Sequence, residues 1–266
     1  MKKESQYVSK KPDENGFVNY TQVEHETWSL LMERQMKIVQ DRACQEYLDG
    51  LEILKFPKHE IPQIPNLNDR LRKQTGWEVA PVPALIGFDR FFSLLAERKF
   101  PCATFIRRQD ELAYLQEPDI FHELFGHCPL LTHPLYADFM QHYGQLGVGQ
   151  SPKIQKLLAR FYWFTVEFGL IQTKNGLKCY GGGLLSSIGE TVYALESDKP
   201  ERVKFDVIDI LRTPYRIDIY QPVYYVIDSF DMLYKAVNDK FIDQIMLASQ
   251  LPEYTPKFMP AEQTEN

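Results

Sequence analysis

Long apolar runs are absent from this chain of 266 residues. It contains no stretch of about 18 apolar residues, which is the length that a membrane-spanning helix needs. The opening residues, MKKESQYVSKKPDENG, carry charge but lack the apolar core of a secretory signal. We therefore expect a cytoplasmic protein that makes no contact with a membrane.

Cysteine and positive charge are also scarce. The four cysteines, at 44, 102, 128 and 179, are far apart and form no CxxC pair, which indicates reduced and buried thiols. The formal net charge is −6. Nucleic acid is thus an unexpected partner, because phosphate binding needs a concentrated basic surface.

The remaining composition, 44% hydrophobic and 25% charged, suits one globular domain with a sizeable core. We expect a loose polar arm over residues 1–20, a folded domain over 21–250 and a proline-rich tail over 251–266. The periodicity predicts helices over 27–51 and 88–96, a strand near 102–107 and a turn at 173–176. The prediction is a mainly α-helical domain with a few short β-strands.

Histidines cluster in the segment PDIFHELFGHCPLLTH, where Pro118 and Asp119 provide a helix start. The segment begins like a zinc-protease HExxH helix, but Gly126 stands where the second histidine should be. His122 and His127 are five residues apart, so on a continuous α-helix they would point about 140° apart. We expect the helix to end near Gly126, which would swing His127 back toward His122.

A third candidate metal ligand is Glu167, in the aromatic run FYWFTVEFGLI. A buried carboxylate there is costly unless it binds a metal or pairs with a cation. Two alternatives remain open, namely a solvated position and an ion pair with Arg160. Two histidines and one carboxylate without a nearby cysteine match the facial triad of non-haem Fe(II) oxygenases.

Several blocks together resemble the pterin-dependent aromatic amino acid hydroxylases. They are CATFIRR, PDIFHELFGHCPLL, FYWFTVEFGL, YGGGLLSSIGE and IYQPVYYVIDSF, in this order, over about residues 80–230. The resemblance implies a single hydroxylase-type catalytic domain in which His122, His127 and Glu167 hold Fe(II). It also implies that Ser186 orients an iron-binding histidine.

The resemblance further assigns the two organic ligands. Phe91 would stack on the tetrahydropterin, with Glu123, Ala159 and Tyr162 on the same side. Arg107 would bind the carboxylate of the amino acid, although without the resemblance it could equally be a surface arginine. The pocket for the aromatic ring would be shaped by a further set of residues, namely Pro118, Trp163, Phe168 and Gly183.

Phenylalanine is the favoured substrate, and the implied reaction uses O₂ to form tyrosine. Trp163 argues against tryptophan, because phenylalanine is expected at this position in tryptophan hydroxylases. Ile217 lies where tyrosine hydroxylases should carry an aspartate, although Asp218 is only one residue away. Tyrosine and tryptophan hydroxylation stay open as alternatives.

The chain differs from the animal members of the family at both ends. The pattern of the catalytic domain begins almost at once, and the tail LPEYTPKFMPAEQTEN has too many prolines for a coiled coil. The short form resembles the bacterial members, so we expect a monomer or a small homo-oligomer without a tetramerisation helix.

Two other classes of protein would use the same three ligands. A zinc hydrolase would activate water, with Glu123 as the base. A non-catalytic protein stabilised by a metal would fill every coordination position, whereas three ligands leave a position open.

Overall fold

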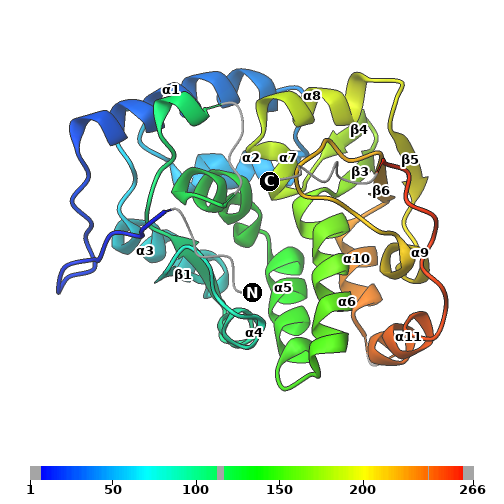
Figure 1. Cartoon of the computed structure of the whole chain (residues 1–266). Coiled ribbons are helices and arrows are strands. Elements are labelled where there is room, and N and C mark those ends of the chain that lie inside the picture. Colours follow the sequence, from blue (N-terminus) through cyan, green and yellow to red (C-terminus); the bar gives the residue numbers. More distant parts are fainter. Residues whose placement is uncertain (1–6, 113–116, 239, 260–266) are drawn as a thin grey trace, which may run out of the picture.

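The structure is a computed structural model that describes residues 7–112, 117–238 and 240–259. The parts of the expected arm and tail at 1–6 and 260–266 lie outside the described residues. Helices dominate the described chain, as the sequence predicts (Figure 1). The α-helices are α1 (Gln22–Val39), α2 (Gln45–Leu54), α3 (Ile64–Thr75), α4 (Phe88–Ala96), α5 (Pro134–Gly147), α6 (Pro152–Tyr162), α7 (Gly182–Leu185), α8 (Ile188–Glu196), α9 (Val207–Arg212), α10 (Phe230–Ala236) and α11 (Phe241–Ala248).

Helices of other types and short strands complete the described elements. The 3₁₀-helices are η1 (Gln109–Glu111) and η3 (Cys128–Thr132), and the π-helices are η2 (His122–His127) and η4 (Trp163–Glu167). The strands are β1 (Glu78–Val82), β2 (Lys99–Ala103), β3 (Leu170–Thr173), β4 (Gly176–Cys179), β5 (Glu201–Lys204) and β6 (Val223–Ile227).

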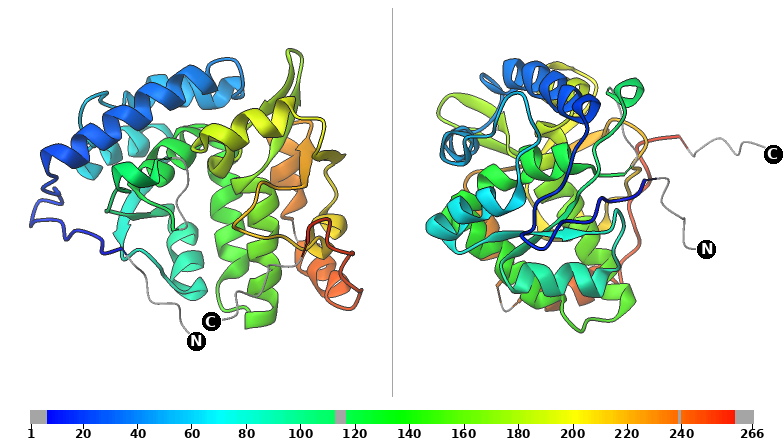
Figure 2. Two further views of the ribbon diagram at one scale, coloured as in Figure 1. Left: turned by 45° about the horizontal axis from the view of Figure 1, so that its top comes forward. Right: turned by 90° about the vertical axis from the view of Figure 1, so that its left-hand side faces the viewer.

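The strands form two small sheets. One has the order β4-β3-β6-β5, in which β3 and β4 are antiparallel while β6 runs parallel to both β3 and β5. The predicted turn at 173–176 joins β3 to β4, since Thr173 pairs with Gly176. The other sheet is the parallel pair β1–β2. Both sheets lie to the side of α5 and α6, which run next to each other in the middle of the molecule (Figures 1 and 2).

Local sequence signals explain many helix starts. Thr21 and Glu24 form a capping box at α1, in which each side chain bonds the other's backbone N–H. Proline occupies the first turn of α3, α5 and α6, where its missing N–H costs nothing. The helix predicted over 88–96 is confirmed as α4.

The single helix expected over 27–51 is wrong, because the chain forms α1 and α2 with a break between them. At the break, the N–H of Cys44 donates to the carbonyl of Cys179 at 2.9 Å, and the N–H of Cys179 donates to the carbonyl of Arg42 at 2.8 Å. This bridge to the end of β4 takes backbone groups that a continuous helix would use itself.

The strand expected near 102–107 is shorter and earlier, because β2 ends at Ala103. The extended residues that follow are held by the beginning of the chain. Thr104 donates from Oγ1 to the carbonyl of Lys10 at 2.6 Å, and its own carbonyl accepts from the Tyr20 hydroxyl at 3.0 Å. Tyr20 and Val18 are both buried in the core.

The core is rich in aromatic rings and surrounds η2. Phe121 and Phe125 stack with ring centroids 4.9 Å apart, and Trp28 meets Phe121 edge-on at 5.3 Å. These three side chains are fully buried. The helical segment of the candidate metal site is therefore fixed within a close-packed interior.

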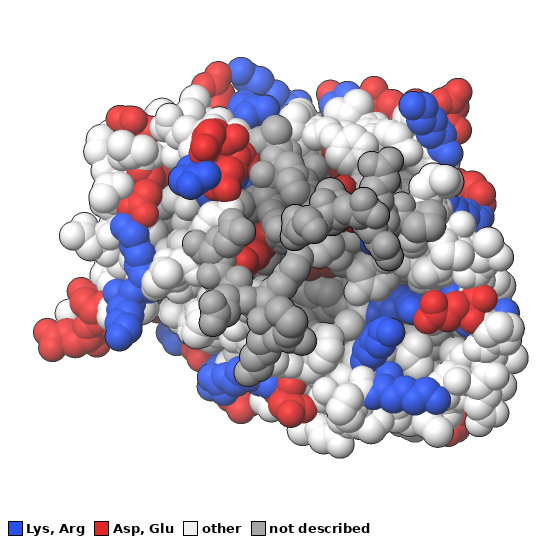
Figure 3. Space-filling model, in the orientation of Figure 1, with Lys and Arg blue, Asp and Glu red and all other residues white. Residues whose placement is uncertain are grey.

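Within the described ranges, none of the helices combines the length and apolar character needed to cross a bilayer. On the face shown in Figure 3, acidic and basic side chains are interspersed around the visible edges.

Candidate metal centre

Both segments that carry the candidate metal ligands are π-helical. η2 spans HELFGH from His122 to His127, and η4 spans WFTVE from Trp163 to Glu167. A π-helix bonds residue i to residue i+5, so residues five apart lie on the same face. The helix was expected to end near Gly126, and η2 ends at His127, but the expected mechanism is wrong: the change of helix type, and not the helix end, brings the two histidines together.

The three expected ligand atoms form a compact triangle. The Nε2 atoms of His122 and His127 are 3.1 Å apart, and Glu167 Oε2 lies 3.6 Å and 3.3 Å from them, respectively. One ion with bonds of about 2.1 Å can contact all three atoms from one side of their plane. The arrangement fits a metal with open positions on its far side.

Ser186 determines the tautomer of His122. The Ser186 hydroxyl donates to the carbonyl of Gly182 at 2.8 Å, and it lies 2.8 Å from His122 Nδ1. Because a hydroxyl has one proton to donate, it must accept from Nδ1–H of the imidazole. The Nε2 lone pair of His122 is then directed to the triangle, as a metal ligand requires.

The charges of the site also suit a cation. Burial lowers the pKa of His122 to about 4, so its ring is neutral at pH 7. Burial raises the pKa of Glu167, but His127, His122 and the N–H of Gly183 outweigh this effect, and the net pKa is below its ordinary value. The result is a neutral imidazole beside a carboxylate, the protonation states that metal binding needs.

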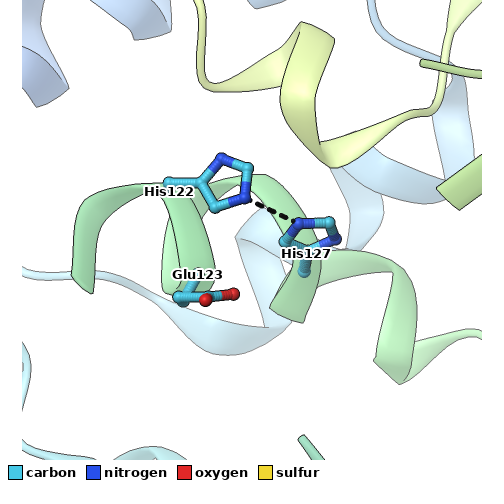
Figure 4. A group of neighbouring side chains, drawn as sticks. All are labelled: His122, Glu123 and His127. Carbon is cyan, nitrogen blue, oxygen red and sulfur yellow. Dashed lines mark hydrogen bonds between the residues drawn. The ribbon is translucent and has the colours of Figure 1, made fainter. Parts of the chain in front are cut away.

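Glu123 is a second carboxylate near the two histidines, and Figure 4 shows it on the turn of η2 that carries His122. Burial, with the charges of Glu167 and Asp119, raises the pKa of Glu123 well above its ordinary value. The raised pKa favours the protonated form of Glu123, whereas the lowered pKa of Glu167 favours its carboxylate. Of the two carboxyl groups, Glu167 is the one ready to bind a metal.

The ion pair between Glu167 and Arg160 that the sequence left open is not formed. Arg160 donates instead to the carbonyl of Leu211 at 2.7 Å and to Glu253 Oε1 at 2.7 Å. Glu167 is thus a partly buried carboxylate whose described side-chain partners are the two histidines.

Glycines allow η2 to approach α7. A Cβ atom at Gly182 would lie 2.4 Å from the His127 ring, and a Cβ atom at Gly126 would lie 2.6 Å from the carbonyl oxygen of Gly182. A side chain at Gly182 would force the His127 ring away, and one at Gly126 would push η2 away from α7. The glycine that breaks the protease motif is therefore needed for packing.

Arg107 is buried and paired with Asp119. Its Nε and Nη2 atoms donate to the two carboxylate oxygens at 2.8 and 2.9 Å, and its backbone N–H donates to Asp119 Oδ2 at 2.9 Å. Asp119 Oδ1 also accepts from the N–H of His122 at 3.0 Å. The Asp119 carboxylate thus caps the helical turn that leads into η2, and it also holds Arg107. The Nη1 atom of Arg107 makes no hydrogen bond to the other described residues.

Aromatic residues surround the other side of the triangle. Phe91 meets Tyr162 edge-on at 5.3 Å, and the Tyr162 ring lies 6.4 Å from that of His127. Ala159, half-buried one turn earlier on α6, accepts the N–H of Trp163 through its carbonyl.

Trp163 packs against two aromatic rings. Its ring centroid is 4.5 Å from that of Phe168 and 4.5 Å from that of Tyr215. Gly183 lies against Phe168, because a Cβ at this glycine would be 3.0 Å from the ring. Pro118 is half-buried directly before Asp119.

Sequence reasoning missed the roles of Asp119 and Gln221. It assigned Asp119 only to a helix start, although an aspartate so near a histidine pair could have indicated a partner for a buried arginine. Gln221 accepts from Trp163 Nε1 at 3.1 Å, a contact between distant segments that no local pattern shows. Asp218, the neighbour of Ile217, pairs with Arg216 at 2.6 Å.

Comparisons with known proteins agree with this geometry. The sequence model of the family described as biopterin-dependent aromatic amino acid hydroxylase matches residues 3–256. The phenylalanine-4-hydroxylase of Vibrio cholerae is 53% identical over 259 residues, which are 97% of this chain and 90% of that protein.

Solved structures give the same result. The phenylalanine hydroxylase of Legionella pneumophila matches with a TM-score of 0.92 and 51% identity, over 95% of this chain and all of that one. The Chromobacterium violaceum phenylalanine hydroxylase with bound oxidised Fe(III) matches with a TM-score of 0.88 and 42% identity, over 95% and 94% of the two chains. The chain belongs to the biopterin-dependent aromatic amino acid hydroxylase family, and the fold class expected from the sequence is confirmed.

Proposed function

We propose that this protein hydroxylates L-phenylalanine to L-tyrosine, with O₂ and a tetrahydropterin as co-substrates. The observation that carries the proposal is the triangle of His122, His127 and Glu167 beside a buried arginine, within a chain about half identical to bacterial phenylalanine hydroxylases. Fe(II) bound there supplies, together with the reduced pterin, the activation of O₂.

The residues of the chain supply binding and orientation. His122, His127 and Glu167 hold the metal, and Ser186 keeps the His122 lone pair directed to it. Arg107 binds the substrate carboxylate with the side of its guanidinium group that Asp119 leaves available, as its bidentate chemistry permits.

The aromatic side chains place the two organic molecules. Trp163, Phe168, Pro118 and Gly183 border the site of the substrate ring and exclude water from it. Phe91 stacks on the pterin, with Tyr162, Ala159 and Glu123 on the same side. None of these residues transfers a proton in an obligatory step, which fits the absence of a base–nucleophile pair among the described site residues.

Three smaller proposals complete the assignment. Residues 21–250 form the catalytic domain, and Val18, Tyr20 and Glu253 of the flanking segments pack against it. The protein acts in the cytoplasm. It is a monomer or a small homo-oligomer, and light scattering of the purified full chain measures this directly.

The deciding experiment measures O₂ uptake and tyrosine formation by the metal-stripped protein given Fe(II), tetrahydropterin and L-phenylalanine. Each component is omitted in turn, and Zn(II) replaces Fe(II) in one arm. Tyrosine that forms only with both iron and pterin supports the proposal. Hydroxylated product from tyrosine or tryptophan alone would change the substrate. No product from phenylalanine, tyrosine or tryptophan would sink the proposal and return the site to the zinc-hydrolase alternative.

A further inference from the structure

Gln221 lies between Trp163, in the aromatic wall of the site, and the loop at 216–219. It is 1% exposed and stands before Pro222 and β6. Its Oε1 accepts from Trp163 Nε1 at 3.1 Å. Its Nε2 donates to the carbonyls of Arg216 at 2.9 Å and Ile219 at 3.0 Å.

These bonds leave the amide of Gln221 only one orientation. Both carbonyls need a donor, and the indole N–H needs an acceptor. A flipped amide would place its NH₂ against the indole N–H and its oxygen against two carbonyl oxygens. The oxygen therefore faces Trp163, and all the polar atoms of the side chain have partners.

A buried carboxyl group anchors the backbone of Gln221. Glu190 Oε1 accepts from the N–H of Gln221 at 2.8 Å and from the Tyr224 hydroxyl at 2.8 Å. Glu190 is 6% exposed and Tyr224 is fully buried. The position of Gln221 is thus fixed by α8 and β6, independently of the loop that it holds.

The loop between α9 and β6 also contacts Trp163 directly. Tyr215, from this loop, stacks on the indole with an interplanar angle of 21°. Trp163 is consequently held at its ring face by Tyr215 and at its ring nitrogen by Gln221. Both contacts depend on the conformation of residues 215–221.

We infer that Gln221 is a positioning residue, which fixes the indole of Trp163 and the loop at 216–219 in one arrangement and thereby sets the wall of the substrate-ring pocket. This inference rests on the proposed function, since it assumes that the ring of the amino acid lies against Trp163. Gln221 acts through Trp163 and does not touch the reacting atoms.

The first test is the isosteric substitution Gln221→Met, which keeps the volume but removes the acceptor and both donors. We expect KM for phenylalanine to rise about tenfold because the indole N–H loses its partner, while KM for the pterin changes less than twofold. Tyrosine formed per pterin oxidised should also fall. Gln172→Leu, at an exposed position of β3, is the matched control and should leave all three quantities unchanged.

A double-mutant cycle separates positioning from a general loss of structure. In a Trp163→Phe background the indole N–H is absent, so Gln221→Met should raise KM for phenylalanine less than twofold further. An equal tenfold rise in both backgrounds would overturn the inference, because Gln221 would then act independently of Trp163.

A spectroscopic test does not depend on activity. The chain has three tryptophans, and the other two indole N–H groups donate to the carbonyls of Pro57 and Ala137. In ¹⁵N-labelled full-length protein before iron is added, Gln221→Met should shift only the Trp163 indole resonance and speed its exchange with water. An unchanged resonance, or equal shifts of all three, would overturn the inference. If the wild-type protein made no tyrosine, the proposed function would fail while this bond could still be confirmed.

Discussion

The two π-helical segments hold their metal ligands in different ways. η2 is fixed by polar contacts, since Asp119 accepts the backbone N–H of His122 and Ser186 bonds the His122 ring. η4 is fixed largely by ring contacts, since Trp163 packs on Tyr215 and Phe168. Hydrogen bonds are directional, so those at η2 orient the lone pair of the His122 ring. Aromatic packing buries a large area, so the rings at η4 fix the position of the pocket wall. The comparison predicts that loss of the hydrogen bond to the His122 ring alters metal binding, and that changes to the rings around Trp163 alter substrate selection.

The largest loss of activity is expected at Glu167, the metal ligand that η4 supplies. Glu167→Ala removes the only carboxylate of the triangle and should lower tyrosine formation by about 1000-fold or more, which is about 4 kcal/mol in transition-state free energy. Iron content after dialysis should fall in parallel, while circular dichroism stays unchanged. An iron-replete and active Glu167→Ala variant would contradict the ligand assignment and would favour Glu123 in its place.

The next largest effect, on stability and on substrate binding, is expected at Asp119. Asp119→Asn leaves the buried Arg107 without its anionic partner, which should destabilise the protein by about 3 kcal/mol. KM for phenylalanine should rise strongly because the arginine loses its fixed position. Chemical denaturation and initial rates measure the two effects.

Asp138→Asn is the matched control for this prediction. Asp138 pairs with Arg98 with its side chain 47% exposed, so its loss should cost about 0–1 kcal/mol. Equal losses of stability in the two variants would show that burial of the Arg107 pair has no special consequence.

A smaller effect is expected at Ser186. Ser186→Ala removes the acceptor of His122 Nδ1–H and should weaken Fe(II) affinity about 10–100-fold. Adding excess Fe(II) should restore much of the activity, which distinguishes weaker binding from a lost catalytic group. Ser197→Ala, whose hydroxyl accepts from the N–H of Lys199, serves as the control and should bind iron normally. If Ser186→Ala also bound iron normally, polar orientation of η2 would be unimportant.

The smallest effect on activity is expected at Glu190, which accepts the backbone N–H of Gln221. Burial raises the pKa of Glu190 from 4.5 to about 7. The folded protein therefore binds this proton more tightly than the unfolded chain, so the free energy of unfolding should fall as pH rises from about 4.5 to 7, by up to about 3 kcal/mol.

Glu190→Gln should flatten this dependence on pH, because an amide does not titrate but still accepts hydrogen bonds. Urea unfolding at several pH values measures the difference from the wild type, and the exposed Glu52→Gln is the control. The same slope in wild type and Glu190→Gln would mean that this carboxyl group does not titrate in the range.

Local parts of the fold could be predicted from the sequence. The helix over 88–96 and the turn at 173–176 depend on neighbouring residues, and both are confirmed. The break between α1 and α2 could not be predicted, because its cause is a backbone bridge to Cys179, far along the chain. Asp119 as the partner of Arg107 was missed for a similar reason, since the chain must fold before the two charges meet.

The sequence by itself determined which groups can bind a metal, through two histidines five residues apart and one glutamate in an aromatic run. It also determined the family, through long blocks in a fixed order. Only the tertiary structure decided how the histidines converge. Helix type depends on hydrogen bonds that packing selects, and here the glycines at 126 and 182 allow a π-helical turn against α7. The spacing of the two histidines does not by itself fix where their side chains point. Packing of the surrounding core determines whether the helix forms i+4 or i+5 hydrogen bonds, and this sets the direction.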